Sequence, residues 1–522
     1  MKRFAFLALC LLSLAPTAFA ITITRGPYFQ LMRPHTVWLR YSTDVACDTL
    51  IKYKKSGSTD ELTVSNGSQV TDHQIQLTDM STFVKYTYSI NTSSQTIASG
   101  SGYFLWTGPD DDHPGVRMRF WALGDSGTGD SNAQDVRDAF VNYMGSNLIG
   151  AIFLLGNNAL PDGKYGAYDK NMFQIYKNQL RNAPVFPTLG EADTNGSTNP
   201  ASDLPYFVLF TLPKGTEGGG QPSGTEKYYS FNYGIIHFVV LDSQADSRSS
   251  TGPMMTWLKN DLDKNILPWL IAVFHHAPYS KGNHDSDSET PMKEMRQNAL
   301  PILEDHGVDL VLSAHSNSYE RSFFLNGHYG TSDTLQPSMI INGGDGRRGS
   351  QGGDGAYRKH VNTTNTGAVY AVIGSSGKVV SGPLNHPAMY TGLARLGSME
   401  FEVNNNILDA YFIQSDNTVG DFFEIVKDNT PGQVHMTAPA DNSTFTRPTT
   451  ITLQADATDP DTRIHRVMFF INGVQLNRNR DFVKPYTFDW TPTTAGKYTV
   501  LAKSLDELGA LLTSSSIQVT IK

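Results

Sequence analysis

The chain has 522 residues and a formal net charge of −9, with 39% hydrophobic and 17% charged residues. This length is too great for one hydrophobic core, so several domains are expected. Neutralising the phosphates of a nucleic acid needs clustered Lys and Arg, and no such cluster stands out, so nucleic acid is not an expected partner.

The first twenty residues have the pattern of an export signal. Basic residues precede an apolar run that ends near Pro16, and the small residues Ala18 and Ala20 form a cleavage-site pattern. That run is too short to span a bilayer, and no later stretch is long and apolar enough to do so. We therefore expect a signal peptide over residues 1–20 and an exported protein, periplasmic or secreted. Cys47 is the only cysteine after this segment, so no intramolecular disulfide is expected.

The two outer parts of the chain have the pattern of β-sandwiches. Apolar and polar residues alternate in short segments over residues 21–108 and again over residues 433–522. The segments TGPDDDHPG (107–115) and KDNTPGQ (427–433) have the Pro, Gly and Asp content of linkers. The sequence thus predicts an all-β domain on either side of a central one.

The central segment, residues 113–428, has a different pattern. Apolar strands end in polar clusters, and helical periodicity appears in Ser131–Met144 and from Pro253 to Leu262. YYSFNYGIIHFVVLDS predicts a hairpin that turns at residues 232–234. These patterns indicate an α/β domain, whose ligand sites lie at the carboxyl ends of the strands.

The stretch GDSG (124–127) admits three interpretations. Ser126 would be a nucleophile in a trypsin-like protease or in a lipase, and Asp125 would be a metal ligand in the third case. A serine nucleophile needs a histidine base that an acid orients. The protease also needs a double β-barrel. The lipase needs an Asp-x-x-His pair late in the domain, which is not found after residue 276 until the β-sandwich region. The metal interpretation is favoured.

Five polar residues occupy equivalent places, each at the end of an apolar strand. A single polar residue there, a lone histidine above all, is more often an ordinary structural residue. Five such residues are expected to converge in space, as a metal site requires. They are Asp125, Asn157, Glu191, His275 and His315.

The order of the motifs carries a family resemblance. GDSG at 124, GNNAL at 156, GEAD at 190, HHAPYS at 275 and AHSNSYER at 314 follow one another along the chain. This series resembles the calcineurin-like metallophosphoesterases of the purple acid phosphatase type. The N-terminal RGPYFQL segment resembles the fibronectin-III-like domain that precedes such enzymes, and the C-terminal segment resembles bacterial Ig-like domains. The resemblance implies a central α/β metallophosphoesterase sandwich, flanked by two all-β sandwiches, that hydrolyses phosphate esters.

Several positions of the family's two-metal centre differ in this chain. Asp125, His275 and His315 match family ligands. The departures are Asn157 for the bridging Asp, Leu160 for a Tyr ligand, Asn317 for the last His, Glu191 for an Asn ligand, and Ala192 for the catalytic His. The first metal site thus keeps only Asp125, and we expect the second metal ion to be lost.

The other metal site gains a carboxylate. Glu191 with His275 and His315 forms a set of two imidazoles and one carboxylate, to which Asn157 adds a weak amide oxygen. Such a set suits one ion of zinc, iron or manganese. The leaving-group acid is absent at Ala192.

Three residues are candidates to replace that acid: His276, His284 and Asp193. His284 lies in a literal GNHD at 282–285, which is interpreted as a coincidence because it follows the strand of His275.

Two functions remain open. One is a secreted phosphoesterase with a degraded, mononuclear site. The other is a catalytically dead pseudophosphatase that binds a phosphorylated or carbohydrate ligand. The Ig-like domain is expected to contact a carbohydrate or a surface partner.

Overall fold

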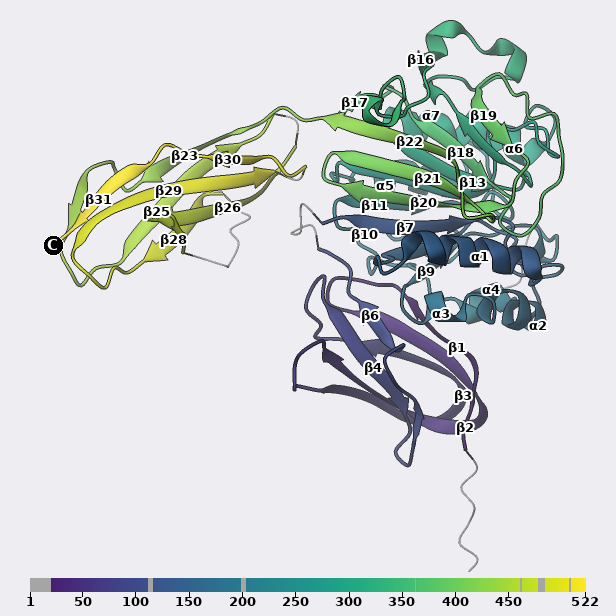
Figure 1. The fold of residues 1–522 in the computed structure, drawn as a ribbon, viewed down its shortest axis with the longest axis horizontal. Coiled ribbons are helices and arrows are strands. Elements are labelled where there is room, and N and C mark those ends of the chain that lie inside the picture. The colour runs from purple at the N-terminus through teal and green to yellow at the C-terminus, as the bar shows by residue number, and fades with distance from the viewer. Residues whose placement is uncertain are drawn as a thin grey trace, which may run out of the picture.

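The computed structural model describes residues 20–110, 116–198, 203–361, 363–460, 462–476, 484–506 and 508–522. Its strands form three groups, and the chain passes through them in order (Figure 1). The N-terminal strands lie below the central group in that view, and the C-terminal strands extend to its left. The structure is multidomain, as the sequence predicts, with β-sandwich domains flanking a central α/β sandwich.

The N-terminal strands form one six-stranded sheet with the order β1-β2-β4-β5, in which β3 pairs with β2 and β6 with β4. Their bounds are β1 (Ile23–Gln30), β2 (Val37–Lys55), β3 (Leu62–Leu77), β4 (Lys85–Asn91), β5 (Thr96–Ala98) and β6 (Phe104–Trp106). Tyr28 joins this sheet to the central group, because its hydroxyl donates to the carbonyl of Leu209 over 2.7 Å.

The central group has two seven-stranded sheets. One has the order β17-β22-β21-β20-β7-β8-β9 and the other β10-β11-β12-β13-β18-β14-β19. The first sheet contains β7 (Met118–Leu123), β8 (Ala151–Leu154), β9 (Val185–Pro187), β17 (Tyr357–His360), β20 (Gly397–Asn404), β21 (Ile407–Gln414) and β22 (Val419–Asp428). The second contains β10 (Tyr229–Tyr233), β11 (Ile236–Val240), β12 (Trp269–His276), β13 (Leu310–Ala314), β14 (Tyr319–Ser322), β18 (Val369–Ile373) and β19 (Met389–Leu393). A small separate pair joins β15 (Phe324–Leu325) and β16 (Ile340–Asn342).

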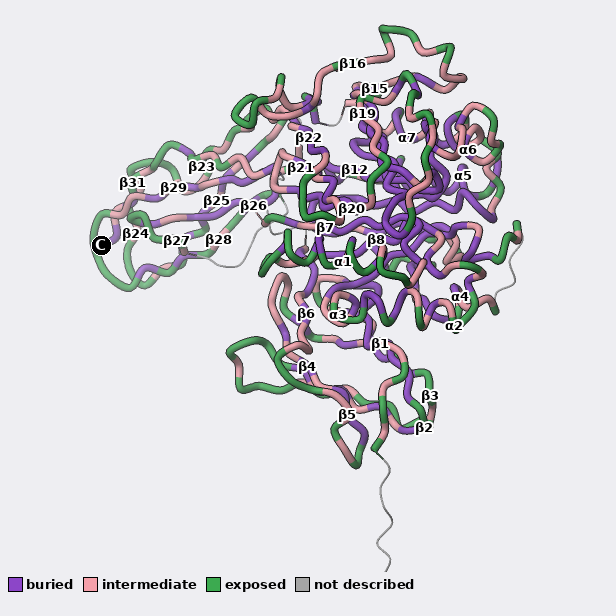
Figure 2. Tube along the Cα trace, turned by 45° about the vertical axis from the view of Figure 1, so that its right-hand side comes forward, coloured by how far each residue is buried: buried purple, intermediate pink, exposed green. Residues whose placement is uncertain are grey.

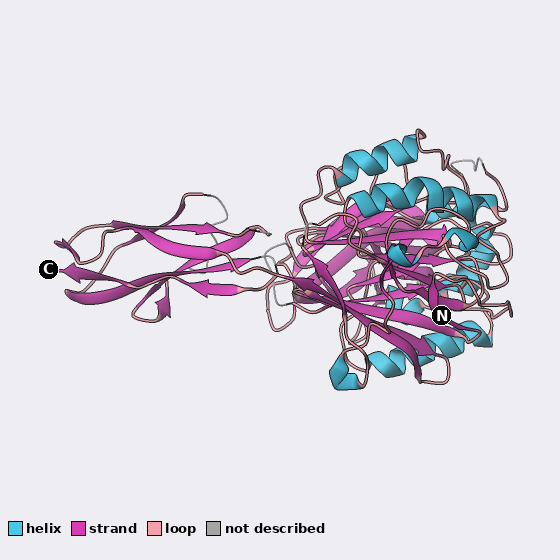
Figure 3. Cartoon of the chain, turned by 90° about the horizontal axis from the view of Figure 1, so that it is seen from above, coloured by secondary structure: helices cyan, strands magenta, loops and turns pink. Residues whose placement is uncertain are grey.

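Helices flank the two central sheets (Figure 3). They are α1 (Ser131–Met144), α2 (Tyr165–Ala167), α3 (Lys177–Leu180), α4 (Pro205–Leu209), α5 (Pro253–Leu262), α6 (Thr290–Glu294) and α7 (Leu300–Asp305). None of the helices within the described ranges is long and apolar enough to cross a membrane.

The C-terminal strands form a three-stranded and a six-stranded sheet. The first joins β23 (Gln433–Ala438), β25 (Ile451–Thr458) and β28 (Tyr486–Trp490). The second joins β24 (Ser443–Phe445), β26 (Ile464–Ile471), β27 (Val474–Gln475), β29 (Gly496–Asp506), β30 (Leu511–Thr513) and β31 (Ile517–Ile521). These sheets enclose a hydrophobic core of their own, which includes Leu453, Phe469 and Val500.

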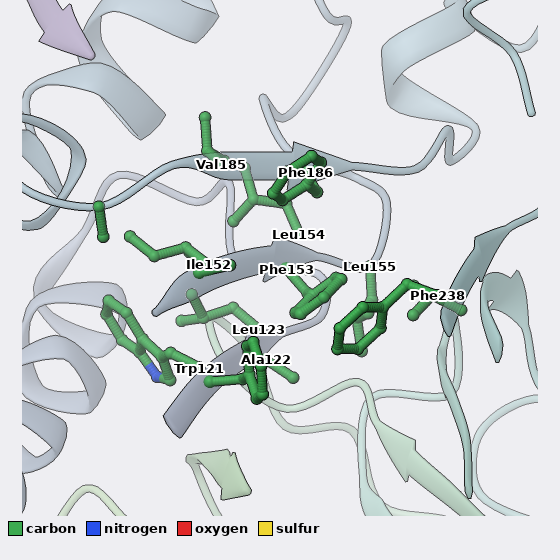
Figure 4. Packing of buried hydrophobic residues seen from close by; sticks show 14 of the residues in the cluster. Trp121, Ala122, Leu123, Ile152, Phe153, Leu154, Leu155, Val185, Phe186 and Phe238 are labelled. Atoms are coloured by element: carbon green, nitrogen blue, oxygen red, sulfur yellow. The ribbon is translucent and has the colours of Figure 1, made fainter. Parts of the chain in front are cut away.

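The inner faces of the central sheets pack through aromatic rings. Phe153 on β8 is fully buried, and its ring centroid lies 4.8 Å from that of Phe238 on β11 (Figure 4). Trp121 on β7 faces the other way and stacks on Phe140 of α1 at 4.0 Å. Because β8 is covered on both sides, its four residues are all apolar and buried. Buried residues accordingly concentrate in the central group (Figure 2).

Two predicted helices and one predicted hairpin have direct counterparts. The helices over Ser131–Met144 and from Pro253 to Leu262 are confirmed as α1 and α5. The hairpin of β10 and β11 is confirmed too, but Tyr233 pairs with Ile236, so its turn lies one residue later than expected. Gly234 in that turn has φ 56°, which glycine adopts without steric cost.

Other predictions have mixed outcomes. Cys47 is a buried free cysteine in the described part of the chain. The signal peptide lies almost wholly outside the described residues, so it stays a prediction. Between the strand groups, β6 ends at Trp106 before β7 begins at Met118, and β22 ends at Asp428 before β23 begins at Gln433. The predicted linkers overlap these intervals, and the division into domains at residues 108, 113, 428 and 433 stays a prediction.

Candidate metal centre

The carboxyl ends of the two central sheets meet at one place. Strands β7, β8 and β9 are parallel and paired in register, so the residues that follow them emerge side by side. In the other sheet, β12 and β13 are also parallel. The first sheet supplies Asp125, Asn157 and Glu191, and the second supplies His275, His276 and His315. The sequence-predicted residues are therefore brought together, with His276 among them.

Backbone conformation at the strand ends is unusual. Asp125, Asn157 and His315 all have left-handed backbones, with φ of 50°, 55° and 67°. A non-glycine residue in a sparsely populated region costs about 1–3 kcal/mol and persists only where the surrounding structure imposes it. Gly156 has φ 93°, and a Cβ there would lie 2.4 Å from Nδ1 of His275. The scaffold thus imposes a close approach between the two sheets.

The carboxylate of Glu191 lies at the centre of the site and contacts several imidazoles. Its Oε2 lies 2.8 Å from Nε2 of His275, and its Oε1 lies 2.8 Å from Nε2 of His276. Nδ1 of His315 lies 3.1 Å from the same Oε1. One carboxylate therefore contacts three imidazoles, and the position that the sequence analysis identified as a gain of charge carries the densest contacts.

Glu191, His276 and His315 form a compact donor set, whose ligand atoms all lie within 4.8 Å of one another. The set expected from the sequence is Glu191 with His275 and His315, so the two sets share Glu191 and His315 and differ in the other histidine. His275 does contact Glu191, but through the other carboxylate oxygen. Its Nδ1 lies 2.7 Å from the carbonyl of Leu155 and so donates to it. Burial acts to lower the pKa of His275, but the Glu191 carboxylate raises it above its ordinary value, so Nε2 also carries a proton, which it donates to Glu191.

The side chain of Asn157 presents its amino group to the site. Its Oδ1 accepts a hydrogen bond from the backbone N–H of Ala192 over 2.8 Å, which fixes the orientation of the amide because a backbone N–H only donates. Its Nδ2 then donates to Oδ1 of Asp125 at 2.7 Å and to Oε2 of Glu191 at 3.1 Å. The expected weak amide-oxygen ligand is therefore not what this geometry offers. The amide instead bridges two carboxylates, as a cation would.

Asp125 links the ends of strands from both central sheets. Its Oδ2 accepts from the backbone N–H of His315 over 2.9 Å, and its Oδ1 accepts from Asn157. Burial raises the pKa of Asp125, and the nearby His275 and the Asn157 hydrogen bond offset this only in part. Asp125 lies outside the compact donor set, and the loss of the first metal site stays a prediction.

The imidazoles differ in charge. Burial acts to lower the pKa of His315, but its hydrogen bonds to Glu191 and Glu289 raise it to about 10. Burial lowers the pKa of His276 to about 3 despite its contact with Glu191. Burial acts to raise the pKa of Glu191 itself, yet the surrounding imidazoles hold it well below its usual range. At neutral pH the site contains an anionic Glu191 beside a protonated His315, so binding a metal ion would release protons.

A second donor set lies next to the first. Oε1 of Glu289 is 2.7 Å from Nδ1 of His284, and its Oε2 is 2.9 Å from Nε2 of His315. Their ligand atoms also lie within 4.8 Å of one another. His284 is among the residues expected from the sequence, whereas Glu289 is not. The only local sequence signal for Glu289 is its position five residues after the histidine of the GNHD segment.

The other candidate residues occupy different surroundings. Asp193 is buried and accepts from the backbone N–H of Gly190 at 2.9 Å and from the hydroxyl of Tyr168 at 2.6 Å. Burial raises its pKa to about 6, and its role as the replacement acid stays a prediction. Ser126 is also buried. Ser243 Oγ lies 2.9 Å from Nδ1 of His276 and orients that ring.

Comparison with known proteins identifies this central region. Residues 118–319 match the calcineurin-like phosphoesterase family, and residues 433–502 match the bacterial Ig domain. The central region is a calcineurin-like phosphoesterase domain. The C-terminal strands form a bacterial Ig domain.

Sequence relatives of the phosphoesterase domain include plant purple acid phosphatases. Purple acid phosphatase 23 of Arabidopsis thaliana is 35% identical over 120 residues, which cover 22% of this chain and 24% of that protein. The match thus spans about a quarter of the relative's length.

Two solved structures share the fold. A purple acid phosphatase from yellow lupin (Lupinus luteus) seeds has a TM-score of 0.61 at 14% identity, covering 77% of this chain and 75% of its own. PhoD has a TM-score of 0.52 at 12% identity, covering 97% and 95%. At these identities the similarity is one of fold alone.

Proposed function

We propose that this protein is a metal-dependent hydrolase of phosphate esters that uses one ion, bound by Glu191, His276 and His315. The observation that carries the proposal is the carboxylate of Glu191, in contact with imidazoles at the meeting point of the two sheets. A carboxylate with two imidazoles fits a zinc, iron or manganese ion. Such an ion, when bound, polarises phosphoryl oxygens and acidifies water.

Residues around the donor set support this assignment by fixing the rings. Ser243 holds Nδ1 of His276, and Leu155 holds Nδ1 of His275, so that both Nε2 atoms face Glu191. Hydrogen bonds of this kind orient ligands and tune their basicity. His275 contacts the second oxygen of the carboxylate and thereby helps to fix its position.

Residue 192 is an alanine and not the catalytic histidine of the family, and this difference limits which leaving groups the site can expel. Asp193 is engaged in structural hydrogen bonds, and His276 belongs to the donor set. Losing a general acid typically costs about 10²- to 10⁴-fold in rate. That cost falls on esters whose leaving group needs a proton, so we propose aryl phosphates and other esters with acidic leaving groups as substrates.

The test is turnover of p-nitrophenyl phosphate by zinc-, iron- and manganese-loaded protein, with Glu191→Gln as the variant. We expect about one tightly bound ion at this site and a loss of activity of about 100-fold or more in the variant. Glu61→Gln is the matched control, because Glu61 directly precedes β3, far from the site in sequence, and forms an exposed pair with Lys52. Equal activity of the two variants, or no turnover with any metal, would refute the proposal.

The amide of Asn157 favours a second candidate. Its amino group donates to both Asp125 and Glu191 and so joins the two carboxylates where a cation would, which is the arrangement expected of a pseudophosphatase that binds a phosphorylated ligand. That protein would bind phosphate or a phosphorylated ligand and show no turnover. Calorimetric titration with phosphate, beside the turnover assay, separates the two.

We also propose export of the chain and a carbohydrate or surface partner for the Ig domain, from the N-terminal pattern and the domain type. Sequencing the N-terminus of protein from the cell envelope and medium tests the export. Cleavage after Ala20 is expected, and an intact Met1 in the cytoplasm would contradict it.

A further inference from the structure

The His284–Glu289–His315 set differs from an ordinary surface ion pair. The carboxylate of Glu289 lies between two imidazoles, at 2.7 Å from His284 and 2.9 Å from His315. The two rings lie 3.8 Å apart between centroids. Glu289 and His284 are about one-third exposed, at 33% and 32%, whereas the side chain of His315 is 9% exposed. The set therefore has one buried face and one that solvent ions can reach.

Local structure does not account for the position of Glu289. This residue occupies the N-cap position of α6, but its side chain makes no capping hydrogen bond. It turns instead to the two imidazoles. A half-exposed ion pair contributes about 0–1 kcal/mol to stability, so fold stability gives little reason for this arrangement.

We propose that His284, Glu289 and His315 form a second cation site for a zinc-class divalent ion, on the outer side of His315. Two imidazoles and one carboxylate form an established donor set for such an ion. A fourth position remains for solvent or a substrate oxygen, because two of the three side chains are partly exposed. We call this set the outer site and the Glu191 set the inner site.

His315 connects the two sites. Its Nδ1 faces Glu191 at 3.1 Å and its Nε2 faces Glu289 at 2.9 Å. A neutral imidazole offers one lone pair, so two ions bound together would remove both ring protons and make His315 a bridging imidazolate. The outer site does not include Asp125, Asn157 or Asn317, and so it is not the first metal site of the resemblance in a changed form.

The outer site also gives a role to the loop KGNHDSD, which carries His284. Hydrogen bonds from neighbouring residues hold this loop in place. The side chain of Asn283 accepts from the backbone N–H of Asn317 over 2.7 Å, and Lys281 contacts Asp287 at 3.1 Å. His284 is thereby carried to His315 from a loop far away in sequence. A rigid support of this kind is what a ligand side chain requires.

The experiment is zinc titration of the metal-stripped, full-length protein against a chromophoric chelator, followed by elemental analysis. Glu289→Gln and His284→Ala are the variants. Glu294→Gln is the matched control, because Glu294 lies on the same helix α6 and pairs with Arg248 instead. We expect each variant to lose one zinc ion per chain, or to bind it about 100-fold more weakly, while the control matches the wild type.

Three results would overturn the outer site. One is unchanged zinc stoichiometry and affinity in Glu289→Gln, and another is zinc loss shared equally by the control. The third is a lowered melting temperature with unchanged zinc affinity, which would show a structural role alone. Circular dichroism establishes that each variant is folded. Glu191→Gln separates this proposal from the proposed function, because the outer ion should remain bound when the inner carboxylate is removed.

Discussion

Replacing the amide of Asn157 tests the electrostatics of the site most directly. In Asn157→Asp, one new oxygen still accepts from the backbone N–H of Ala192, because Oδ1 already does so. The other oxygen takes the place of Nδ2, at 2.7 Å from Asp125 and 3.1 Å from Glu191. Two attractive contacts thus become contacts between carboxylates.

Two energies limit the expected loss of unfolding free energy: the repulsion between the carboxylates and the cost of protonating one of them. Two unit charges about 3 Å apart repel by about 5 kcal/mol at an effective dielectric constant of about 20. The new carboxyl group can escape this repulsion by taking up a proton. At pH 7 that costs about 4 kcal/mol, since its ordinary pKa is about 3.9 and each unit is about 1.4 kcal/mol. We therefore expect metal-free Asn157→Asp to lose about 2–4 kcal/mol of unfolding free energy at pH 7, and less at pH 5.

A metal ion reverses this effect. The added carboxylate raises the affinity of the site for a cation, and an ion that binds only the folded state stabilises it by mass action, by about 2.7 kcal/mol at one hundred times the dissociation constant. Urea unfolding with EDTA or with excess zinc measures both states.

Asn142→Asp on α1 is the control, because its amide donates to the exposed Asn417 and belongs to neither donor set. The reasoning would be refuted if metal-free Asn157→Asp were as stable as this control, or if zinc stabilised Asn157→Asp no more than it stabilises the wild type.

Three further predictions concern the scaffold. Gly156→Ala places a Cβ 2.4 Å from Nδ1 of His275 at a positive φ, so we expect a loss of about 2–4 kcal/mol and weaker zinc binding, measured by unfolding and titration. Phe153→Ala empties the fully buried centre of the inter-sheet core and should cost about 3–5 kcal/mol in urea unfolding, with a cost under 1 kcal/mol contradicting the packing argument. Burial and the adjacent Glu402 raise the pKa of Glu400 to about 8. Between pH 4.5 and 8 the folded protein therefore keeps a proton on Glu400 that the unfolded chain has lost. Wild-type stability should fall as the pH rises from about 4.5 to 8. Glu400→Gln should remove that decline and be more stable than the wild type at pH 9 by about 2–4 kcal/mol, whereas parallel pH profiles would contradict the shifted pKa.

Much of the fold was predictable because its signals are local. The helix over Ser131–Met144 follows from its periodicity: Val136, Phe140 and Met144 are all buried, as the pattern requires. The strand ends were also predictable, since a buried apolar run that stops at Asp125 or Asn157 marks the place where a strand leaves the sheet. Parallel strands then bring such residues to one edge.

The sequence by itself therefore determined which side chains reach the meeting point of the two sheets, and that Glu191 brings a carboxylate there. Only the tertiary structure decided how they face one another. The amide of Asn157 is oriented by a backbone N–H that lies 35 residues away, and no local pattern encodes that contact. Likewise, His276 rather than His275 shares the compact set, and Glu289 reaches His315 from a loop 26 residues earlier in the chain. The physical reason is that periodicity places a side chain on a sheet or at its end, whereas the direction of a lone pair depends on hydrogen-bond partners that only folding brings near.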